Sequence, residues 1–138
     1  MYEVLYYSMT GRTRKLADAI AGELGIKAKS IKSSSIDRGA RVIFLGSGSY
    51  GGKHSDDMAK FIENNDFNGR KVALFGTSGS GDGKEVTSMA DSLKKKGAVI
   101  AGSYYCKGRA FLVVNFSHPD KNDLEGVKKF AREMINKN

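Results

Sequence analysis

The chain of 138 residues is 40% hydrophobic and carries 23 Lys and Arg against 15 Asp and Glu, a net charge of +8. This composition predicts one globular domain, residues 1–138, and excludes a disordered chain, while the single cysteine excludes a disulfide-stabilised scaffold. No basic-then-apolar leader opens the chain and no apolar run approaches the roughly 20 residues of a membrane helix, so we expect a cytoplasmic protein without membrane insertion. The basic residues are scattered, which favours a solvated surface over a nucleic-acid site.

Strands and helices alternate along the chain. In chain order the predicted strands are residues 2–7, a weak 27–31, 41–45, 71–75 and a bipartite 98–105 with 111–116. The first predicted helix carries its apolar residues at helical spacing, at Leu16, Ala17, Ile20, Ala21 and Leu24. Further helices are predicted from a Ser55 cap, from Glu85 to Gly97, and from about Asp120.

This alternation predicts a doubly wound α/β fold with a parallel sheet covered by helices on both faces. The second crossover is the exception, because residues 32–40 are short, serine-rich and without helical periodicity. We therefore expect the helix there to be short or absent. In such a sheet a ligand binds beyond the carboxyl ends of the strands, so the loops after strands carry the functional information.

The loop between the first strand and the first helix predicts a phosphate site. Backbone N–H groups of the first helical turn, the positive end of the helix dipole and short hydroxyl side chains point at one spot there. The candidate residues are Ser8, Met9, Thr10, Gly11, Arg12 and Thr13. The alternative is a capped turn without a ligand, in which the hydroxyl groups satisfy the helix.

Two more loops rich in glycine and serine follow strong strands, at residues 47–52 and 77–83. Their candidate binding residues are Ser47, Gly48, Ser49, Tyr50, Gly51, Thr77, Ser78, Gly79 and Asp82. Three such loops meet at one edge if their strands are neighbours, and this convergence supports a binding site. For Tyr50 the alternative is packing on the next helix, and Asp82 is placed to cap the helix that follows it.

These loops resemble those of the flavodoxin family in its short-chain form, and the resemblance spans the chain. The matching motifs are Ser8-x-Thr10-Gly11-x-Thr13 for the phosphate loop, residues 46–54 and 75–79 for the two flavin loops, and residues 106–108 and 118–120 near the end. The resemblance implies a flavodoxin-like sheet of five parallel strands in the order 2-1-3-4-5. It also implies FMN, held non-covalently, with Tyr50 stacked on the flavin and the backbone of Ser78 and Gly79 at its pyrimidine edge.

Two features depart from the family pattern. The third loop, residues 77–83, contains no aromatic residue that could stack on the second face of the ring. The chain is also basic, whereas the family's electron carriers are typically acidic near the flavin. We expect a higher two-electron potential than that of an acidic flavodoxin, because positive charge stabilises the anionic reduced form.

The remaining reactive side chains favour plain structural roles. His54 and His118 have no carboxylate or cysteine at ligand spacing and are interpreted as surface or capping histidines, so no metal site is expected. Cys106 is interpreted as a partly buried small hydrophobe, with a thiol activated by Lys107 and Arg109 as the alternative. No catalytic residue is assigned.

The leading hypothesis is therefore a monomeric FMN electron carrier that serves redox partner proteins, acidic ones among them. Three alternatives stay open: a small FMN-dependent quinone or flavin reductase, a flavodoxin-like activator of a metal-radical enzyme, and a flavodoxin-fold binding module without FMN.

Overall fold

The computed structural model describes residues 1–9, 11–107 and 119–137. Its sheet has five parallel strands. The elements in chain order are β1 (Tyr2–Tyr7), α1 (Arg12–Leu24), β2 (Lys29–Ser30), a 3-10 turn η1 (Ile31–Ser33), β3 (Val42–Gly48), α2 (Asp56–Asn64), β4 (Lys71–Ser78), α3 (Lys84–Lys95), β5 (Val99–Lys107) and α4 (Lys121–Lys137). The strand order is β2-β1-β3-β4-β5, which confirms the predicted topology.

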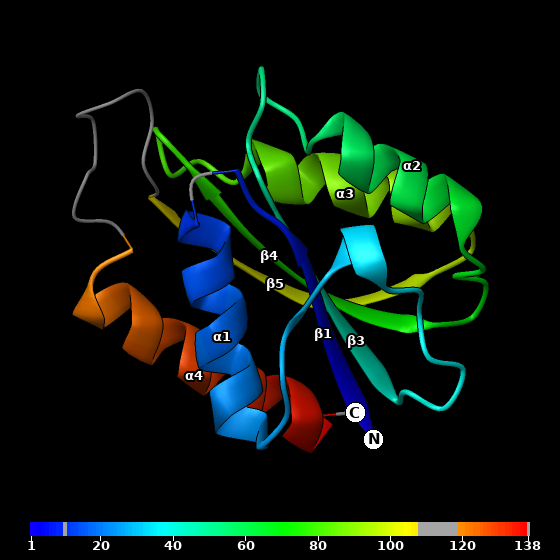
Figure 1. Ribbon diagram of the computed structural model, residues 1–138, viewed down its shortest axis with the longest axis horizontal. Coiled ribbons are helices and arrows are strands. Elements are labelled where there is room, and N and C mark those ends of the chain that lie inside the picture. Colours follow the sequence, from blue (N-terminus) through cyan, green and yellow to red (C-terminus); the bar gives the residue numbers. More distant parts are fainter. Residues whose placement is uncertain (10, 108–118, 138) are drawn as a thin grey trace.

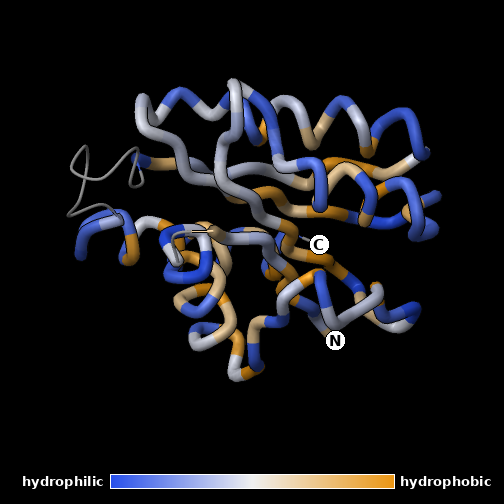
Figure 2. Tube along the Cα trace, turned by 45° about the horizontal axis from the view of Figure 1, so that its top comes forward, coloured by the Kyte–Doolittle hydropathy of each residue, from blue (hydrophilic) through white to orange (hydrophobic). Residues whose placement is uncertain are grey.

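Helices cover both faces of this sheet, as Figure 1 shows, with α1 and α4 on one side and α2 and α3 on the other. Side chains of successive strand residues point to opposite faces, so each face has its own core. Val4, Phe44 and Phe75 pack under α1 and α4. Leu5 and Leu74 pack under α2 and α3. Because both faces are buried, the central strands are almost continuously apolar, and the hydrophobic colour in Figure 2 follows them.

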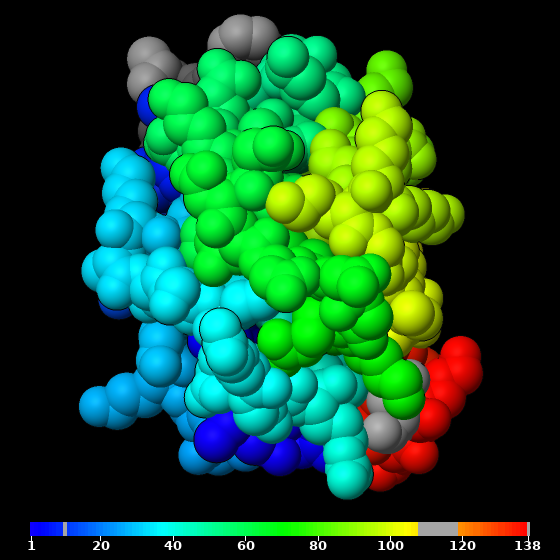
Figure 3. Space-filling view, turned by 90° about the vertical axis from the view of Figure 1, so that its right-hand side faces the viewer, coloured from blue at the N-terminus to red at the C-terminus, as the bar shows by residue number. Residues whose placement is uncertain are grey.

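The second crossover confirms the expectation of a short or absent helix. After the two-residue strand β2 the chain forms only η1, in which the Ser30 hydroxyl accepts a hydrogen bond from the Lys32 N–H at 3.2 Å. The space-filling view in Figure 3 shows this segment beside α2, with α3 on the far side of α2. The predicted strand 27–31 is thus wrong in length, since only Lys29 and Ser30 pair with β1.

The two central strands extend further than predicted. β3 continues to Gly48 and β4 to Ser78, because parallel pairing persists at Ser47 with Gly76 and at Gly48 with Thr77. Four residues assigned to loops by the sequence therefore lie at strand ends. The second part of the predicted bipartite strand, residues 111–116, lies outside the described residues.

The helix boundaries agree with the sequence signals. The Ser55 hydroxyl caps α2 by accepting the Met58 N–H at 3.0 Å, and Gly97, with φ of +84°, follows the end of α3. Among the described residues, no helix is long and apolar enough to cross a membrane.

Candidate functional site

Three loops meet at the carboxyl edge of the sheet, joined by one hydrogen bond between each pair. The hydroxyl groups of Thr13 in α1 and Thr77 in β4 lie 2.9 Å apart and are buried. The Ser49 N–H donates to the Thr77 carbonyl at 3.0 Å, and the Met9 N–H donates to the Tyr50 hydroxyl at 3.3 Å. The convergence predicted from the sequence is therefore present.

The first loop turns sharply into α1. Gly11 occupies the N-cap position with φ of +83°, a conformation that glycine adopts without strain, and has no side chain that could cap the helix. Its N–H donates to the Ser8 hydroxyl at 3.0 Å. The first turn of α1 contains no acidic residue, and it begins with Arg12. Thr10 lies outside the described residues. A helix start without a carboxylate is suited to an anion.

The second loop is built around Tyr50. Its ring lies edge-on to Tyr7, with the centroids 6.0 Å apart, and covers Gly48, where an added Cβ would meet the Tyr50 hydroxyl at 3.2 Å. Burial raises the pKa of Tyr50 above its usual value. The next residue, Gly51, has φ of +66° and is exposed. Tyr50 thus ties the second loop to the first.

The third loop is closed by its own polar groups. The Ser78 hydroxyl accepts the Gly81 N–H at 2.8 Å, and the Asp82 carboxylate accepts the Lys84 N–H at 3.2 Å. The bond from Lys84 lowers the pKa of Asp82. The N-cap of α3 is Gly83, which has no side-chain cap bond, so Asp82 accepts the first N–H of the helix from the position before the N-cap. Gly79 lies in the same loop, half-buried.

His54 corrects a prediction. It is 7% exposed, and its Nδ1 lies 2.6 Å from the Ser88 hydroxyl of α3, so the surface or capping interpretation is wrong. The second loop folds the imidazole inward against α3, a tertiary contact that local sequence does not show. Burial, together with Lys53, lowers the pKa of His54, which favours the neutral ring. His118 lies outside the described residues.

Cys106 is 8% exposed and pairs with Thr77 across the two last strands of the sheet. Burial and then the charge of Asp123 raise the pKa of its thiol to about 12. A raised pKa keeps the thiol protonated at neutral pH, which supports the interpretation of Cys106 as a buried small hydrophobe. Arg109, one of the two cations of the alternative interpretation, lies outside the described residues.

Sequence reasoning missed Glu85, which it treated only as the start of a helix. Glu85 is fully buried, in the first turn of α3, and its side chain lies over Gly76 of β4. An added Cβ at Gly76 would meet the Glu85 Cγ at 2.6 Å. The signal that could have found it is the glycine in the middle of an apolar strand, which marks the close approach of another group.

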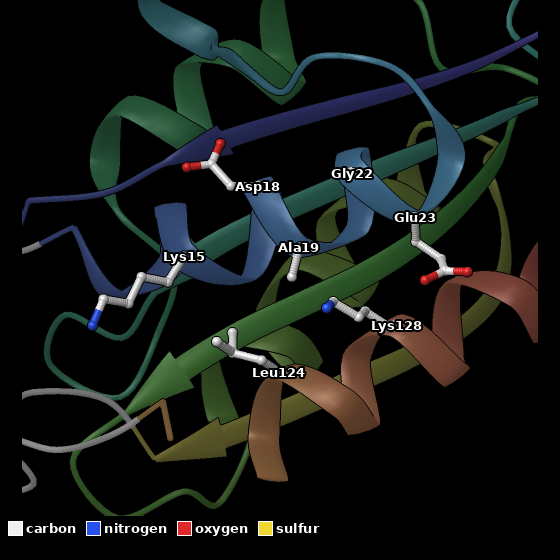
Figure 4. A pocket seen from close by; sticks show the side chains of 7 residues that line it. All are labelled: Lys15, Asp18, Ala19, Gly22, Glu23, Leu124 and Lys128. Atoms are coloured by element: carbon white, nitrogen blue, oxygen red, sulfur yellow. The ribbon is translucent and has the colours of Figure 1, made fainter. Parts of the chain in front are cut away.

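Several surface hollows lie among the described residues. One of about 510 Å³ is bounded by Tyr7, Tyr50, Lys53 and the first turn of α2, so it adjoins the second loop. Another of about 620 Å³ lies between α1 and α4 and is lined by side chains of both charges, which Figure 4 shows projecting from the two helices. Among the described residues, no group of three His, Cys, Asp or Glu side chains is placed to hold a metal ion.

Comparisons with known proteins agree with the fold. The family model of the flavodoxin domain matches residues 3–137. The chain is 32% identical to the uncharacterised protein MJ0298 of Methanocaldococcus jannaschii, over 96% of each chain. It is 30% identical to the flavodoxin of Clostridium beijerinckii, over 71% of this chain and 79% of that protein. Among solved structures, a flavodoxin from the domain Archaea superposes with a TM-score of 0.81 at 21% identity, covering 99% of this chain and 96% of that one.

Proposed function

Because the chain belongs to the flavodoxin family, we propose that it binds FMN non-covalently and carries electrons between redox partner proteins as a single domain and a monomer. The observation that carries this proposal is the junction of the three loops, in which Thr13, Thr77 and Tyr50 hold the loops together. The proposed FMN-binding residues are Ser8, Met9, Thr10, Gly11, Arg12, Thr13, Ser47, Gly48, Ser49, Tyr50, Gly51, Thr77, Ser78, Gly79 and Asp82.

The groups at this edge fit the chemistry of FMN. The start of α1 offers the helix dipole and backbone N–H groups without an opposing carboxylate, as a phosphate requires. The second and third loops offer small residues at positive φ, at Gly51 and Gly81, which let a planar ligand approach the backbone closely. Tyr50 adds an aromatic surface between the first and second loops.

The residues of the chain bind and orient the cofactor in this proposal, and bound FMN supplies the electron transfer. Arg12 and the hydroxyl groups of the first loop hold the phosphate. Tyr50 would cover one face of the flavin ring, and the third loop, residues 77–83, has no aromatic residue that could cover the other face, where we place the partner. The net charge of +8 favours an acidic redox partner.

A reductase is the second candidate function, and one observation favours it. The hollow of about 510 Å³ beside Tyr50 is large enough for a small substrate such as a quinone next to the cofactor site. In that function the same open edge accepts a small molecule instead of a protein.

Electron-transfer assays separate the two candidates. FMN-loaded protein is reduced with dithionite under anaerobic conditions and mixed with an acidic rubredoxin, and in parallel it is supplied with NADH, NADPH and a soluble quinone. A carrier reoxidises rapidly with the protein acceptor and shows no steady-state quinone turnover. Sustained quinone turnover with a nicotinamide donor would favour the reductase, and failure to retain FMN would contradict both.

A further inference from the structure

Glu85 is a carboxyl group in an unusual place. It is 0% exposed, and its Oε2 accepts the Val86 N–H at 3.3 Å. Among the described residues, Oε1 has no hydrogen-bond partner. A buried carboxylate oxygen without a donor is costly, so such a group is retained where its protonation state has a use.

The backbone of β4 makes room for this side chain directly beneath the third loop. The Cγ and Cδ of Glu85 lie over Gly76, within 2.8 Å of the position that a Cβ would occupy. Gly76 immediately precedes Thr77, which is bonded to both other loops. The carboxyl group therefore lies on the α3 side of the sheet, one residue along β4 from the junction of the loops that hold the cofactor in the proposed function.

The charges that face Glu85 do not neutralise it. Asp82 in the third loop and the buried thiol of Cys106 in β5 interact with it, and neither is a cation. Lys84, its neighbour, is exposed and pairs with Asp82 at 3.8 Å. His54 is turned to Ser88 on the same helix. The pKa of Glu85 is raised above its usual value, and burial is the largest cause. Hydrogen bonds from backbone N–H groups lower the pKa, but by less than burial raises it.

Resting on the proposed function, we propose that Glu85 is a redox-linked proton acceptor, which takes a proton from water when FMN bound at the neighbouring loop junction is reduced. Glu85 takes up one proton for every two electrons that an external reductant delivers, and it becomes a neutral acid. FMN, when bound, would supply the electron-accepting ring, which would take up one proton of its own and carry one negative charge. In a site of low dielectric, a carboxylate near that charge is repelled by it, and protonation removes the repulsion.

The test is the pH dependence of the reduction potential of FMN-loaded wild type and Glu85→Gln, measured by anaerobic titration with indicator dyes. The wild-type potential falls more steeply with pH than that of Glu85→Gln over an interval above the ordinary glutamate pKa. At higher pH the potential of the variant is the higher one. Equal slopes in the two proteins, with FMN bound to both, would overturn the assignment of Glu85 and leave the proposed function intact.

Two controls isolate the effect. Glu3 is also buried, at the opposite edge of the sheet, where its Oε2 accepts the Asp37 N–H at 2.9 Å, so Glu3→Gln is a matched loss of a buried carboxylate. Asp91→Asn removes an exposed carboxylate of the same helix, α3, outside the proposed binding residues. Both variants keep the wild-type pH dependence of the reduction potential. A smaller pH dependence in either variant would assign the proton to another group or show a general effect of charge.

A second measurement needs no variant. Carbon-13 NMR follows the titration of the Glu85 carboxyl in the wild type with oxidised and with reduced FMN. The titration midpoint moves to higher pH on reduction, and an unchanged midpoint overturns the proposal. Failure to bind added FMN is visible in the absorption spectrum and overturns the proposed function together with this inference.

Discussion

Two strand-to-helix junctions at the same edge of the sheet have opposite chemistry. At the start of α2, Ser55 caps the helix and two carboxylates, Asp56 and Asp57, lie in its first turn. At the start of α1, glycine occupies the N-cap position, no acidic residue follows and the first residue is Arg12. At the α2 junction, the Ser55 side chain satisfies a backbone N–H group and the two carboxylates stabilise the positive end of the helix dipole. This is the pattern of a helix start that serves only stability.

The difference explains why only the α1 junction suits a ligand. A carboxylate in the first turn already neutralises the positive end of a helix and repels an anion, so a phosphate is disfavoured at α2. The α1 junction leaves that end available and binds its loop through Ser8 and Thr13 instead of through a cap. Substitutions at Arg12, Thr13 and Ser55 test this contrast.

The largest effect is expected from Arg12→Asp, which gives α1 the first residue that α2 has. The substitution replaces a cation by an anion beside the phosphate and weakens FMN binding by about 2 kcal/mol, close to thirtyfold. Flavin fluorescence quenching measures the affinity. The matched control is Asp56→Arg, the reverse change at the first residue of α2, which leaves FMN affinity unchanged and lowers stability by about 0.5 kcal/mol. Equal losses of affinity would show that the two junctions do not differ in function.

Thr13→Val separates the loop contact from the helix start. It leaves the buried Thr77 hydroxyl without its partner at 2.9 Å and lowers the free energy of unfolding by about 1–3 kcal/mol. The double variant Thr13→Val with Thr77→Val costs less than the sum of the two single variants, because no hydroxyl is then orphaned. Urea unfolding without FMN gives all three values, and additive losses would exclude coupling between the two loops.

Ser55→Ala removes the cap of α2 and leaves α1 untouched. The loss of the bond to the Met58 N–H lowers the free energy of unfolding by about 1 kcal/mol. FMN affinity stays at the wild-type value, since the α2 junction does not contact FMN in the proposed function. A loss of affinity with unchanged stability would contradict the division between the two junctions.

The smallest effect is the pH dependence contributed by His54. Its pKa in the folded state lies below the ordinary 6.5, so the unfolded chain binds the proton first. The stability that His54 contributes is present above pH 6.5 and is lost as pH falls from 6.5 toward the folded pKa. Glu85 has the opposite sign, because its raised pKa makes stability fall as pH rises above 4.5. Urea unfolding of wild type and His54→Gln between about pH 5 and pH 7 isolates the histidine, and parallel curves would contradict its assignment.

The parts of this fold that depend on local pattern were predictable. Apolar runs, Ser55 and Gly97 placed most strands and helix ends, and the alternation of elements gave the parallel sheet. The parts that depend on distant contacts were not. β3 and β4 gained residues through pairing with each other, and His54 is buried because α3 supplies Ser88. Glu85 is buried because a glycine nine positions earlier leaves space for it, which a helix-start pattern does not reveal.

The central claim is that the α1 junction binds the phosphate of FMN, and a paired titration tests it directly. The protein without cofactor is titrated with FMN and, separately, with riboflavin, which lacks the phosphate, while flavin fluorescence is recorded. The account predicts one FMN per chain and an affinity for riboflavin weaker by about a hundredfold or more, since charge-assisted hydrogen bonds are lost. Equal affinity for the two flavins, or no quenching by either, would contradict it.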